Sequence, residues 1–336
     1  MNKNKITGII LIALCAVIAL VLIIALIPTE SEKSNPFLVG EGELPMIAAH
    51  RGGGYSNPEN TMLAFREAVY TYGVDIIESD LYLTKDGHLV YNHDSYIDQT
   101  CNVNGDISRT EVDILCSNTA NRHYIKDMTL EELKQYNFGY YFRASDGSYP
   151  YRDVSDLGTA GVEIATAEQL FAEFYLTHPD LLFIIEIKNS GERGKAACES
   201  LGAILEKYPE YKDNVVVSSF HADVEHEIKK NYPDLMRGAS LFSAASFIIT
   251  EQMGISCLDG AGYDCLQLPV GYDIGIQIRF DLEQYVKKAH ERNIAVQYWT
   301  INDETTMRRL IELGCDAITT DNPALLAKVL EDYRKQ

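Results

Sequence analysis

The stretch from residue 46 to residue 83, MIAAHRGGGYSNPENTMLAFREAVYTYGVDIIESDLYL, decides the fold class. Its first apolar run, Met46–Ala49, predicts a strand, and Asp75–Leu83 predicts the next one. Between them Thr61–Tyr72 has the apolar spacing of a helix, and Gly73 follows as a stop signal. A strand, a helix and a second strand in this order predict a parallel sheet with helices outside it.

The same alternation continues to the end of the chain. Further strands are predicted at Leu182–Ile187, Val215–Ser218, Leu235–Ala239, Cys265–Leu268, Ile294–Trp299 and Asp316–Thr319. Helices are predicted at Lys195–Lys207, Ala222–Asn231, Leu282–Arg292 and Glu304–Leu313. This number of units, without a GxGxxG turn, favours a closed TIM-type (β/α)8 barrel over an open doubly wound sheet. A further strand at His88–Asn92 follows Asp75–Leu83 too closely for a helical crossover, so we expect one strand of this pair outside the barrel.

The first residues of the chain are of a different kind. Ile6–Ile27 carries no charge and is long enough to cross a hydrocarbon core of about 30 Å. It is longer than the apolar region of a signal peptide, and no small-residue cleavage site follows, so an uncleaved anchor is favoured over a cleaved signal. Because Lys3 and Lys5 precede the run, we expect a single-pass protein of the cell membrane with an extracytoplasmic catalytic domain. The predicted division is an anchor at 1–28, a linker at 29–44 and a barrel at 45–336.

Composition excludes some classes of partner. The chain has 29 basic and 49 acidic residues, a formal net charge of −20, so it lacks the basic surface that a nucleic-acid-binding protein needs. Its 7 cysteines form no CxxC pair and no zinc-finger spacing. In an oxidising compartment Cys101 and Cys116, or Cys257 and Cys265, could form disulfides, and buried free thiols are the alternative. The sequence does not indicate an oligomeric state.

An insertion of about 95–180 interrupts the alternation after the His93 strand. Its segment Tyr136–Asp153 is rich in aromatic residues, namely Tyr136, Phe138, Tyr140, Tyr141, Phe142, Tyr149 and Tyr151. A barrel loop of this size often forms a lid or a wall of the substrate pocket. The alternative is that the aromatic side chains only attach the insertion to the barrel.

Polar residues that could carry chemistry follow the first strand. His50-Arg51-Gly52 comes directly after Met46–Ala49, at the end of a barrel strand where active sites lie. Arg51 can donate two hydrogen bonds to a phosphate, and His50 can move a proton near neutral pH.

A pair of carboxylates lies on the second strand. Glu78 and Asp80 are two residues apart, so they share one face at a separation of about 7 Å. On an inward face they would repel each other unless a cation lies between them, and oxygen ligands suit Mg²⁺ or Ca²⁺. The alternative is that both face solvent.

The hairpin that follows predicts a partner for these carboxylates. If Asp86-Gly87 is a two-residue loop, His93 lies opposite Asp80, and with a four-residue loop it lies opposite Glu78. Directly opposed residues share a face, so either register points His93 toward the carboxylates.

Two later strands end in further candidates. Glu186-Ile187-Lys188 would place a third carboxylate and a phosphate-binding amine at the same end of the barrel. Trp299, the only tryptophan, ends another strand and would form either a wall of the substrate pocket or part of the core.

Together these stretches resemble the glycerophosphodiester phosphodiesterase family over roughly residues 45–330. The matching motifs, in order, are His50-Arg51-Gly52 with Pro58-Glu59-Asn60-Thr61, Glu78-x-Asp80, Thr84-x-Asp86-Gly87, His93-Asp94, Glu186-Ile187-Lys188, Trp299-Thr300-x-Asn302 and Thr320-Asp321-x-Pro323. The resemblance implies a TIM-type barrel, a divalent metal (Mg²⁺ or Ca²⁺) and hydrolysis of glycerophosphodiesters to glycerol 3-phosphate and an alcohol.

The resemblance also implies a role for each matching residue. His50 and His93 would be an acid–base pair, and Arg51 and Lys188 would bind phosphate. The metal ligands would be Glu78, Asp80 and Glu186, with Glu59 near the metal. The alternatives are a cyclising phospholipase D-like lyase on the same barrel and a non-catalytic surface protein that binds glycerophosphodiesters. The substrate stays open among head-group diesters, lysophospholipids and wall polymers.

Two stretches depart from the family pattern. Gln99-Thr100-Cys101 stands where the family tends to have an Arg-Thr-Thr run, so one cationic contact is missing. Ile164-Ala165-Thr166-Ala167 stands where the family usually has Ile-Pro-Thr-Leu before a helix, and we expect that change to be structural.

Overall fold

The structure is a computed structural model that describes residues 34–254, 259, 262–273 and 277–335. The predicted anchor at 1–28 lies outside these residues. Among the described helices, none is both long enough and apolar enough to cross a membrane.

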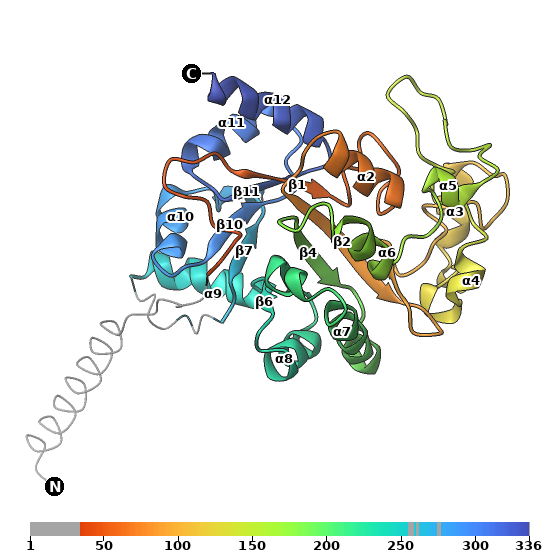
Figure 1. Cartoon of the computed structure of the whole chain (residues 1–336), viewed down its shortest axis with the longest axis horizontal. Coiled ribbons are helices and arrows are strands. Elements are labelled where there is room, and N and C mark those ends of the chain that lie inside the picture. The colour runs from red at the N-terminus through yellow and green to blue at the C-terminus, as the bar shows by residue number, and fades with distance from the viewer. Residues whose placement is uncertain (1–33, 255–258, 260–261, 274–276, 336) are drawn as a thin grey trace, which may run out of the picture.

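Eight parallel strands form the nearly closed barrel that the sequence predicts (Figure 1). In ring order they are β6 (Met236–Arg237), β5 (Val215–Ser218), β4 (Leu182–Ile187), β2 (Ile76–Leu83), β1 (Met46–His50), β11 (Ala317–Thr320), β10 (Ala295–Tyr298) and β7 (Cys265–Leu268). A parallel bridge between Gly238 and Cys265 links the two ends of this order. The prediction of a TIM-type barrel is therefore confirmed.

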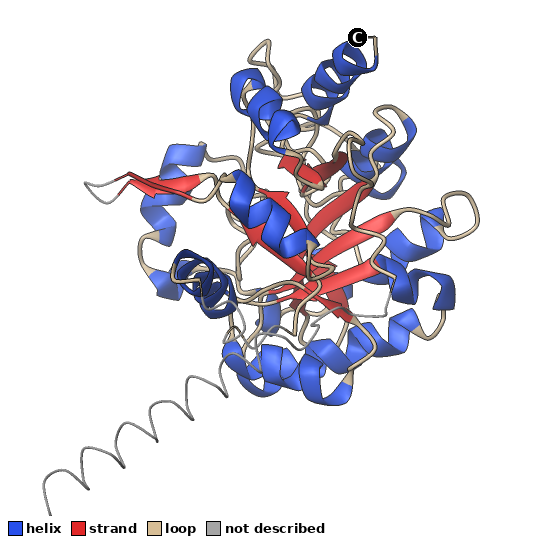
Figure 2. Cartoon of the chain, turned by 90° about the vertical axis from the view of Figure 1, so that its left-hand side faces the viewer, coloured by secondary structure: helices blue, strands red, loops and turns tan. Residues whose placement is uncertain are grey.

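Helices surround the strands on the outside (Figure 2). The helices around the barrel are α2 (Met62–Tyr70), α6 (Ala167–Phe174), α7 (Gly191–Leu205), η3 (Pro209–Asn214), α8 (Ala222–Asn231), α9 (Leu241–Gln252), α10 (Glu283–His290), α11 (Glu304–Leu313) and α12 (Pro323–Arg334). The insertion contains α3 (Arg109–Cys116), η1 (Thr119–Asn121), η2 (Ile125–Asp127), α4 (Leu130–Leu133) and α5 (Leu157–Ala160). A small hairpin, β8 (Gly271–Asp273) with β9 (Gln277–Arg279), follows β7.

Local sequence explains where several helices begin. Thr61 caps α2, because its side chain accepts a hydrogen bond from the Ala64 backbone N–H. Thr166 and Gln169 form a reciprocal capping box at the start of α6. This threonine belongs to the stretch that departs from the family pattern, and its structural role there is to begin a helix.

The ninth strand, β3 (Leu89–Tyr91), lies outside the barrel and pairs antiparallel with β2, as predicted. The predicted register was wrong, because the loop Lys85–Gly87 has three residues and Gly87 adopts the left-handed conformation with φ 89°. As a result the backbone N–H of Asn92 donates to the carbonyl of Asp80 at 3.1 Å, and Asn92 takes the place predicted for His93.

A short N-terminal segment closes the amino-terminal end of the barrel. The Asn35 side chain donates to the carbonyls of Asp264 and Asn293 at 2.9 and 3.0 Å, just before β7 and β10. The Phe37 side chain is 0% exposed and packs in a cluster to which all eight barrel strands contribute, including Ala48 and Ile76. Part of the predicted linker at 29–44 therefore packs with the barrel.

Removal of the Phe37 side chain should destabilise the domain. Phe37→Ala leaves a cavity that strand side chains cannot fill, and we expect a loss of about 3–5 kcal/mol in the free energy of unfolding. Phe242→Ala is the matched control, because that side chain is 84% exposed. Urea denaturation curves of the two variants check this, and equal midpoints would contradict the proposed packing role.

The cysteines described here are free thiols. Cys101, Cys116 and Cys265 are all buried and unbridged, which favours the free-thiol alternative. Cys257, the second predicted partner of Cys265, lies outside the described residues.

Candidate active site

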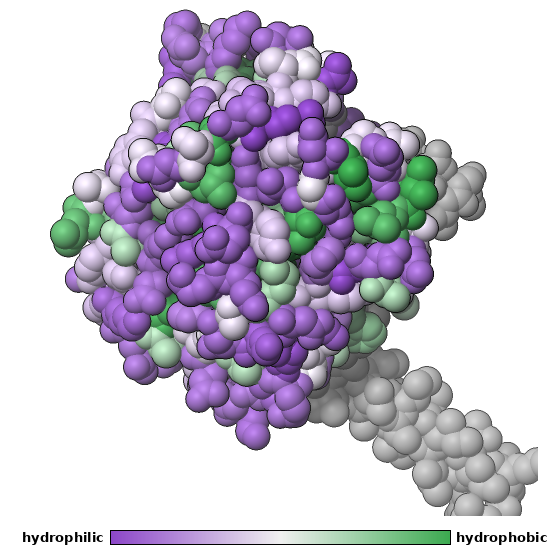
Figure 3. All heavy atoms as spheres, turned by 90° about the vertical axis from the view of Figure 1, so that its right-hand side faces the viewer, coloured by the Kyte–Doolittle hydropathy of each residue, from purple (hydrophilic) through white to green (hydrophobic). Residues whose placement is uncertain are grey.

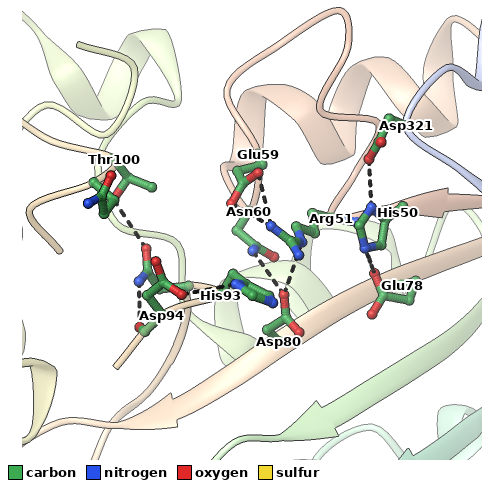
Figure 4. A network of polar contacts seen from close by, with 12 residues as sticks. His50, Arg51, Glu59, Asn60, Glu78, Asp80, His93, Asp94, Thr100 and Asp321 are labelled. Carbon is green, nitrogen blue, oxygen red and sulfur yellow. Dashed lines mark hydrogen bonds and ion pairs between the residues drawn. The ribbon is translucent and has the colours of Figure 1, made fainter. Parts of the chain in front are cut away.

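Most of the predicted site residues lie on β1, β2 and β4 or directly after them, and Figure 4 shows those of β1 and β2. His50 is the last residue of β1 and is the register partner of Glu78 on β2. Asp80, two residues further along β2, is the register partner of Glu186 on β4. Strand pairing thus brings together residues that lie far apart in the sequence, at the end of the barrel where active sites form.

His50 is held between two carboxylates. Its Nδ1 lies 2.6 Å from Oδ1 of Asp321, and its Nε2 lies 3.9 Å from Oε2 of Glu78. Burial alone would lower the pKa of His50, but the hydrogen bond to Asp321 and the two negative charges outweigh it and raise the pKa. The ring therefore keeps its proton to a higher pH than a free histidine.

Asp321 was not among the candidates chosen from the sequence. It directly follows β11, and the Asn302 amide donates to its Oδ2 at 2.7 Å, which fixes the carboxylate that orients His50. Burial raises its pKa, but the bond from His50 and the other contacts outweigh this and the pKa of Asp321 is lowered. The signal was present, because Asp321 belongs to the matching motif Thr320-Asp321-x-Pro323, to which the sequence analysis gave no role.

The carboxylates of β2 are buried and close to one another. Burial and the charge of Asp80 raise the pKa of Glu78 to about 7, against the opposing effect of His50. The Glu78 Oε2 atom accepts the backbone N–H of Arg51 at 3.0 Å. Glu78 therefore gains or loses a proton near neutral pH unless further positive charge reaches the site.

Two cations contact these carboxylates. Nζ of Lys188 lies 3.0 Å from Oδ1 of Asp80 and 2.8 Å from Oε2 of Glu186. Nε of Arg51 lies 3.5 Å from Oδ2 of Asp80, and its Nη1 lies 3.1 Å from Oε1 of Glu59. The predicted phosphate-binding residues and the predicted metal ligands thus lie within direct reach of one another.

The backbone around Arg51 requires a glycine beside it. Arg51 has φ 52°, and its carbonyl accepts the backbone N–H of Asn60, which has φ 57°. Gly52 follows with φ 81°, and a Cβ there would lie 2.8 Å from Cδ1 of Phe65. The tight turn lets Arg51 reach Glu59 and Asp80 on either side.

His93 reaches the same group of residues by another route. It lies beyond the end of β3, and Figure 4 shows its ring beside Asp80 and Arg51. Its Nδ1 lies 3.1 Å from Oδ1 of Asp94, and the side chain is 38% exposed. The bend after the strand, rather than the predicted register, places this histidine at the site.

A metal at these residues stays a prediction. The described residues contain no group of three or more His, Cys, Asp or Glu side chains that could hold a metal ion. The donors are nevertheless of the kind that hard cations prefer, since Glu78, Asp80 and Glu186 offer only oxygen. Asn60 adds a buried Oδ1 without a hydrogen-bond partner, and its Nδ2 lies 3.4 Å from Asp80. This oxygen-rich set fits Mg²⁺ or Ca²⁺.

A pocket of about 480 Å³ opens between the barrel and the insertion. Its barrel side includes Arg51, Glu59 and His93. Three of the aromatic residues singled out in the insertion line the opposite side, namely Phe138, Tyr141 and Phe142. The prediction of a pocket wall therefore agrees with these three side chains.

The remaining aromatic residues have other surroundings. Tyr151 donates its hydroxyl to the Asn57 side chain at 2.7 Å, which ties the insertion to the loop before α2. Trp299 directly follows β10 and is 36% exposed, and it is not part of the lining of the 480 Å³ pocket. Trp299 is therefore not a buried core residue, and it is not part of the pocket wall that the insertion forms.

Comparison with known proteins agrees with this arrangement. Residues 50–325 match the glycerophosphoryl diester phosphodiesterase family. A glycerophosphodiester phosphodiesterase of Caldanaerobacter subterraneus is 28% identical over 286 residues, which cover 85% of this chain and 97% of that protein.

Two solved structures share the fold. The glycerophosphoryl diester phosphodiesterase domain of a Mycobacterium tuberculosis protein has a TM-score of 0.67 at 19% identity, covering 86% of this chain and 100% of that one. A phosphodiesterase of Oleispira antarctica, solved in complex with the product sn-glycerol-3-phosphate, has a TM-score of 0.61 at 20% identity, covering 86% and 97%. Because the family match spans both the barrel and the residues of the site, the chain belongs to the glycerophosphoryl diester phosphodiesterase family and is an enzyme of that class.

Proposed function

We propose that the chain hydrolyses glycerophosphodiesters to glycerol 3-phosphate and an alcohol, with His50 and His93 as the acid–base pair. The observation that carries the proposal is the position of His50, held by Asp321 and Glu78 at the same barrel end as Arg51 and Lys188, the two cations predicted to bind phosphate. A phosphodiester needs charge neutralisation, a nucleophile and a proton for the leaving alkoxide. The residues of this site can supply or position all three.

The surroundings of His50 support one assignment of the proton transfers. Arg51 and Lys188 bind the phosphate oxygens, and His93 accepts the proton of the attacking hydroxyl as the new P–O bond forms. His50, whose pKa is raised, gives its proton to the leaving oxygen as the old P–O bond breaks. If a substrate glycerol hydroxyl attacks first, water opens the resulting cyclic phosphate and the histidines exchange roles.

The proposal includes a divalent cation, Mg²⁺ or Ca²⁺, held by Glu78, Asp80 and Glu186, with Glu59 nearby. When bound, it would act as a Lewis acid toward the phosphate. The raised pKa of the buried Glu78 supports this, because the protein alone leaves that carboxylate incompletely neutralised. With the carboxylates satisfied, Lys188 and Arg51 are free to turn toward substrate.

Product analysis tests the proposed reaction. The purified protein is incubated with glycerophosphocholine, and phosphorus NMR follows the products. We expect glycerol 3-phosphate as the final product. Accumulation of the cyclic phosphate would instead identify a lyase, and binding without turnover would identify a non-catalytic binding protein.

We also propose that residues 1–28 anchor the protein in the cell membrane with the domain outside. The uncharged run Ile6–Ile27 and the preceding lysines support this. The chain enters the domain at the amino-terminal end of the barrel, where Asn35 and Phe37 pack, so the site at the carboxyl end lies at the opposite end from the tether. Protease added to intact cells should release an active domain, and protection until lysis would reverse the orientation.

A further inference from the structure

Two arginines of the insertion enter the active-site pocket. Arg109 and Arg143 both line the 480 Å³ pocket that also contains Arg51 and His93. Neither belongs to the motifs that carry the family resemblance. Gln99, which stands where the family tends to have an arginine, lines the same pocket.

The fold positions Arg109 over Gln99. Arg109 is the first residue of α3, whose start is fixed by a capping box between Ser108 and Glu111. Its guanidinium donates to the carbonyl of Gln99, and its Nε lies 3.5 Å from Oδ1 of Asp113. The Gln99 amide donates to the same Asp113 oxygen at 3.1 Å. The positive charge of Arg109 therefore lies beside Gln99, although the family resemblance places a cation at position 99 itself.

The Arg143 guanidinium makes a weak contact within the insertion. Its Nε donates to the carbonyl of Gly147 at 3.4 Å, which is long for such a bond. The Arg109–Asp113 pair is weak as well, because both side chains are more than half exposed. Both guanidinium groups therefore have hydrogen-bonding capacity left for a ligand.

The two carboxylates of the pocket, Glu59 and Asp94, each contact a residue of the proposed catalytic site. Glu59 accepts from Arg51 at 3.1 and 3.2 Å, and Asp94 contacts His93 at 3.1 Å. Arg109 and Arg143 add two positive charges to this pocket wall, in a chain whose formal net charge is −20. Figure 3 shows a mainly hydrophilic surface on the side of the molecule that carries the insertion. An anionic group approaching this acidic protein would find local attraction here.

We propose that Arg109 and Arg143 bind a second anionic group on the alcohol half of the substrate, so that the enzyme favours diesters whose alcohol carries a further phosphate. This inference rests on the proposed hydrolysis of glycerophosphodiesters. Arg51 and Lys188, which lie at the barrel strands, bind the phosphodiester group that is cleaved. Arg109 and Arg143 of the insertion bind the second phosphate, which stays intact. Arginine suits this task because its planar group donates two parallel hydrogen bonds to phosphate.

The aromatic side chains of the wall suggest a competing occupant. Phe138, Tyr141 and Phe142 could contact a quaternary ammonium group such as that of choline through their ring faces. Two arginines in the same wall would repel that cation, and the carboxylates of the pocket are already engaged with Arg51 and His93. The charges thus favour an anion, and the rings would contact the carbon chain between the two phosphates.

A matched pair of substrates tests the inference. One is the diester of glycerol phosphate with a second glycerol, and the other is the same molecule with a phosphate on that second glycerol. We expect the wild type to show a higher kcat/KM for the phosphorylated diester. The double variant Arg109→Gln with Arg143→Gln should reduce this preference by roughly 10- to 100-fold, the loss expected for charge-assisted hydrogen bonds. The preference of the wild type should also fall with added salt, because exposed charges are screened.

The double variant Lys126→Gln with Lys134→Gln is the control. It removes the same charge from the insertion, but neither lysine lines the pocket. We expect it to keep the wild-type preference. An unchanged preference in the arginine variant would overturn the inference while leaving the proposed hydrolysis intact. An equal loss in both double variants would also overturn it, since net charge alone would then be the cause. Failure of the wild type to cleave either diester would instead overturn the proposed function.

Discussion

His50→Ala and His93→Ala should each lower kcat by roughly 10²–10⁴-fold, the usual contribution of a positioned acid or base. His50 contacts Asp321 and Glu78, so His50→Ala removes the proton donor that these two carboxylates position. His93 lies beyond the end of β3 with its ring partly exposed, so its removal should leave the fold unchanged. Steady-state kinetics, with circular dichroism as a check on folding, measure both effects.

The two histidines act in one reaction, so the reductions in kcat caused by the two substitutions should not multiply. The double variant should lose less than the product of the single losses. His221→Ala is the control, because His221 lies between β5 and α8 but does not line the pocket that contains His93. We expect that control to lose far less activity. If His93→Ala changed only KM, His93 would be a binding residue.

The surroundings of His50 indicate which histidine is the acid. Its raised pKa keeps the ring protonated to a higher pH, and activity that depends on this proton should fall as pH rises through that pKa. A substrate with a p-nitrophenolate leaving group needs little protonation. It should therefore rescue His50→Ala and leave His93→Ala impaired. Rescue of the opposite variant would exchange the roles, and rescue of neither would contradict the acid–base pair.

The barrel could be predicted because its strands are buried on both faces. Leu182–Ile187 reads LFIIEI, an almost unbroken apolar run, and the structure places β4 on those same residues. Val215–Ser218, Cys265–Leu268, Ala222–Asn231 and Glu304–Leu313 were likewise predicted residue for residue. Helix α9 was missed, because its sequence LFSAASFIITEQ is apolar without a clear helical period.

The site was predicted where polar residues lie within or at the ends of barrel strands, and the prediction failed where loop geometry decides. Motif spacing was enough to choose His50, Glu78 and Glu186. The register of His93 depended on a hairpin whose length is set by the left-handed Gly87, and the sequence fits several loop lengths there. Phe37 was assigned to a linker because its neighbours are polar. Its burial depends on a ring of strands that are distant in the sequence.

Chelation of divalent metal ions is expected to abolish turnover, and Mg²⁺ or Ca²⁺ should restore it. The reason is the charge distribution of the site, where Glu78, Asp80 and Glu186 lie together and Lys188 contacts only two of them. Removing the cation would leave Lys188 and Arg51 bound to these carboxylates instead of to the phosphate. Activity measured against free metal concentration, after dialysis with a chelator, checks this. Restoration by Zn²⁺ alone would contradict an oxygen-bound hard cation.

Glu186→Gln is expected to weaken metal binding by roughly 10²-fold, at least the loss seen when outer hydrogen-bond partners of metal ligands are removed. The variant keeps the shape of the side chain but loses the charge, so the metal concentration needed for half-maximal activity should rise. Glu192→Gln removes the same charge from a carboxylate on α7 that is 90% exposed and pairs with Lys195, so it is the matched control. Calorimetric titration of metal into the two chelator-treated variants measures binding without relying on turnover. If the two variants bind metal equally well, Glu186 is not a ligand, and its contact with Lys188 would be its main role in the site.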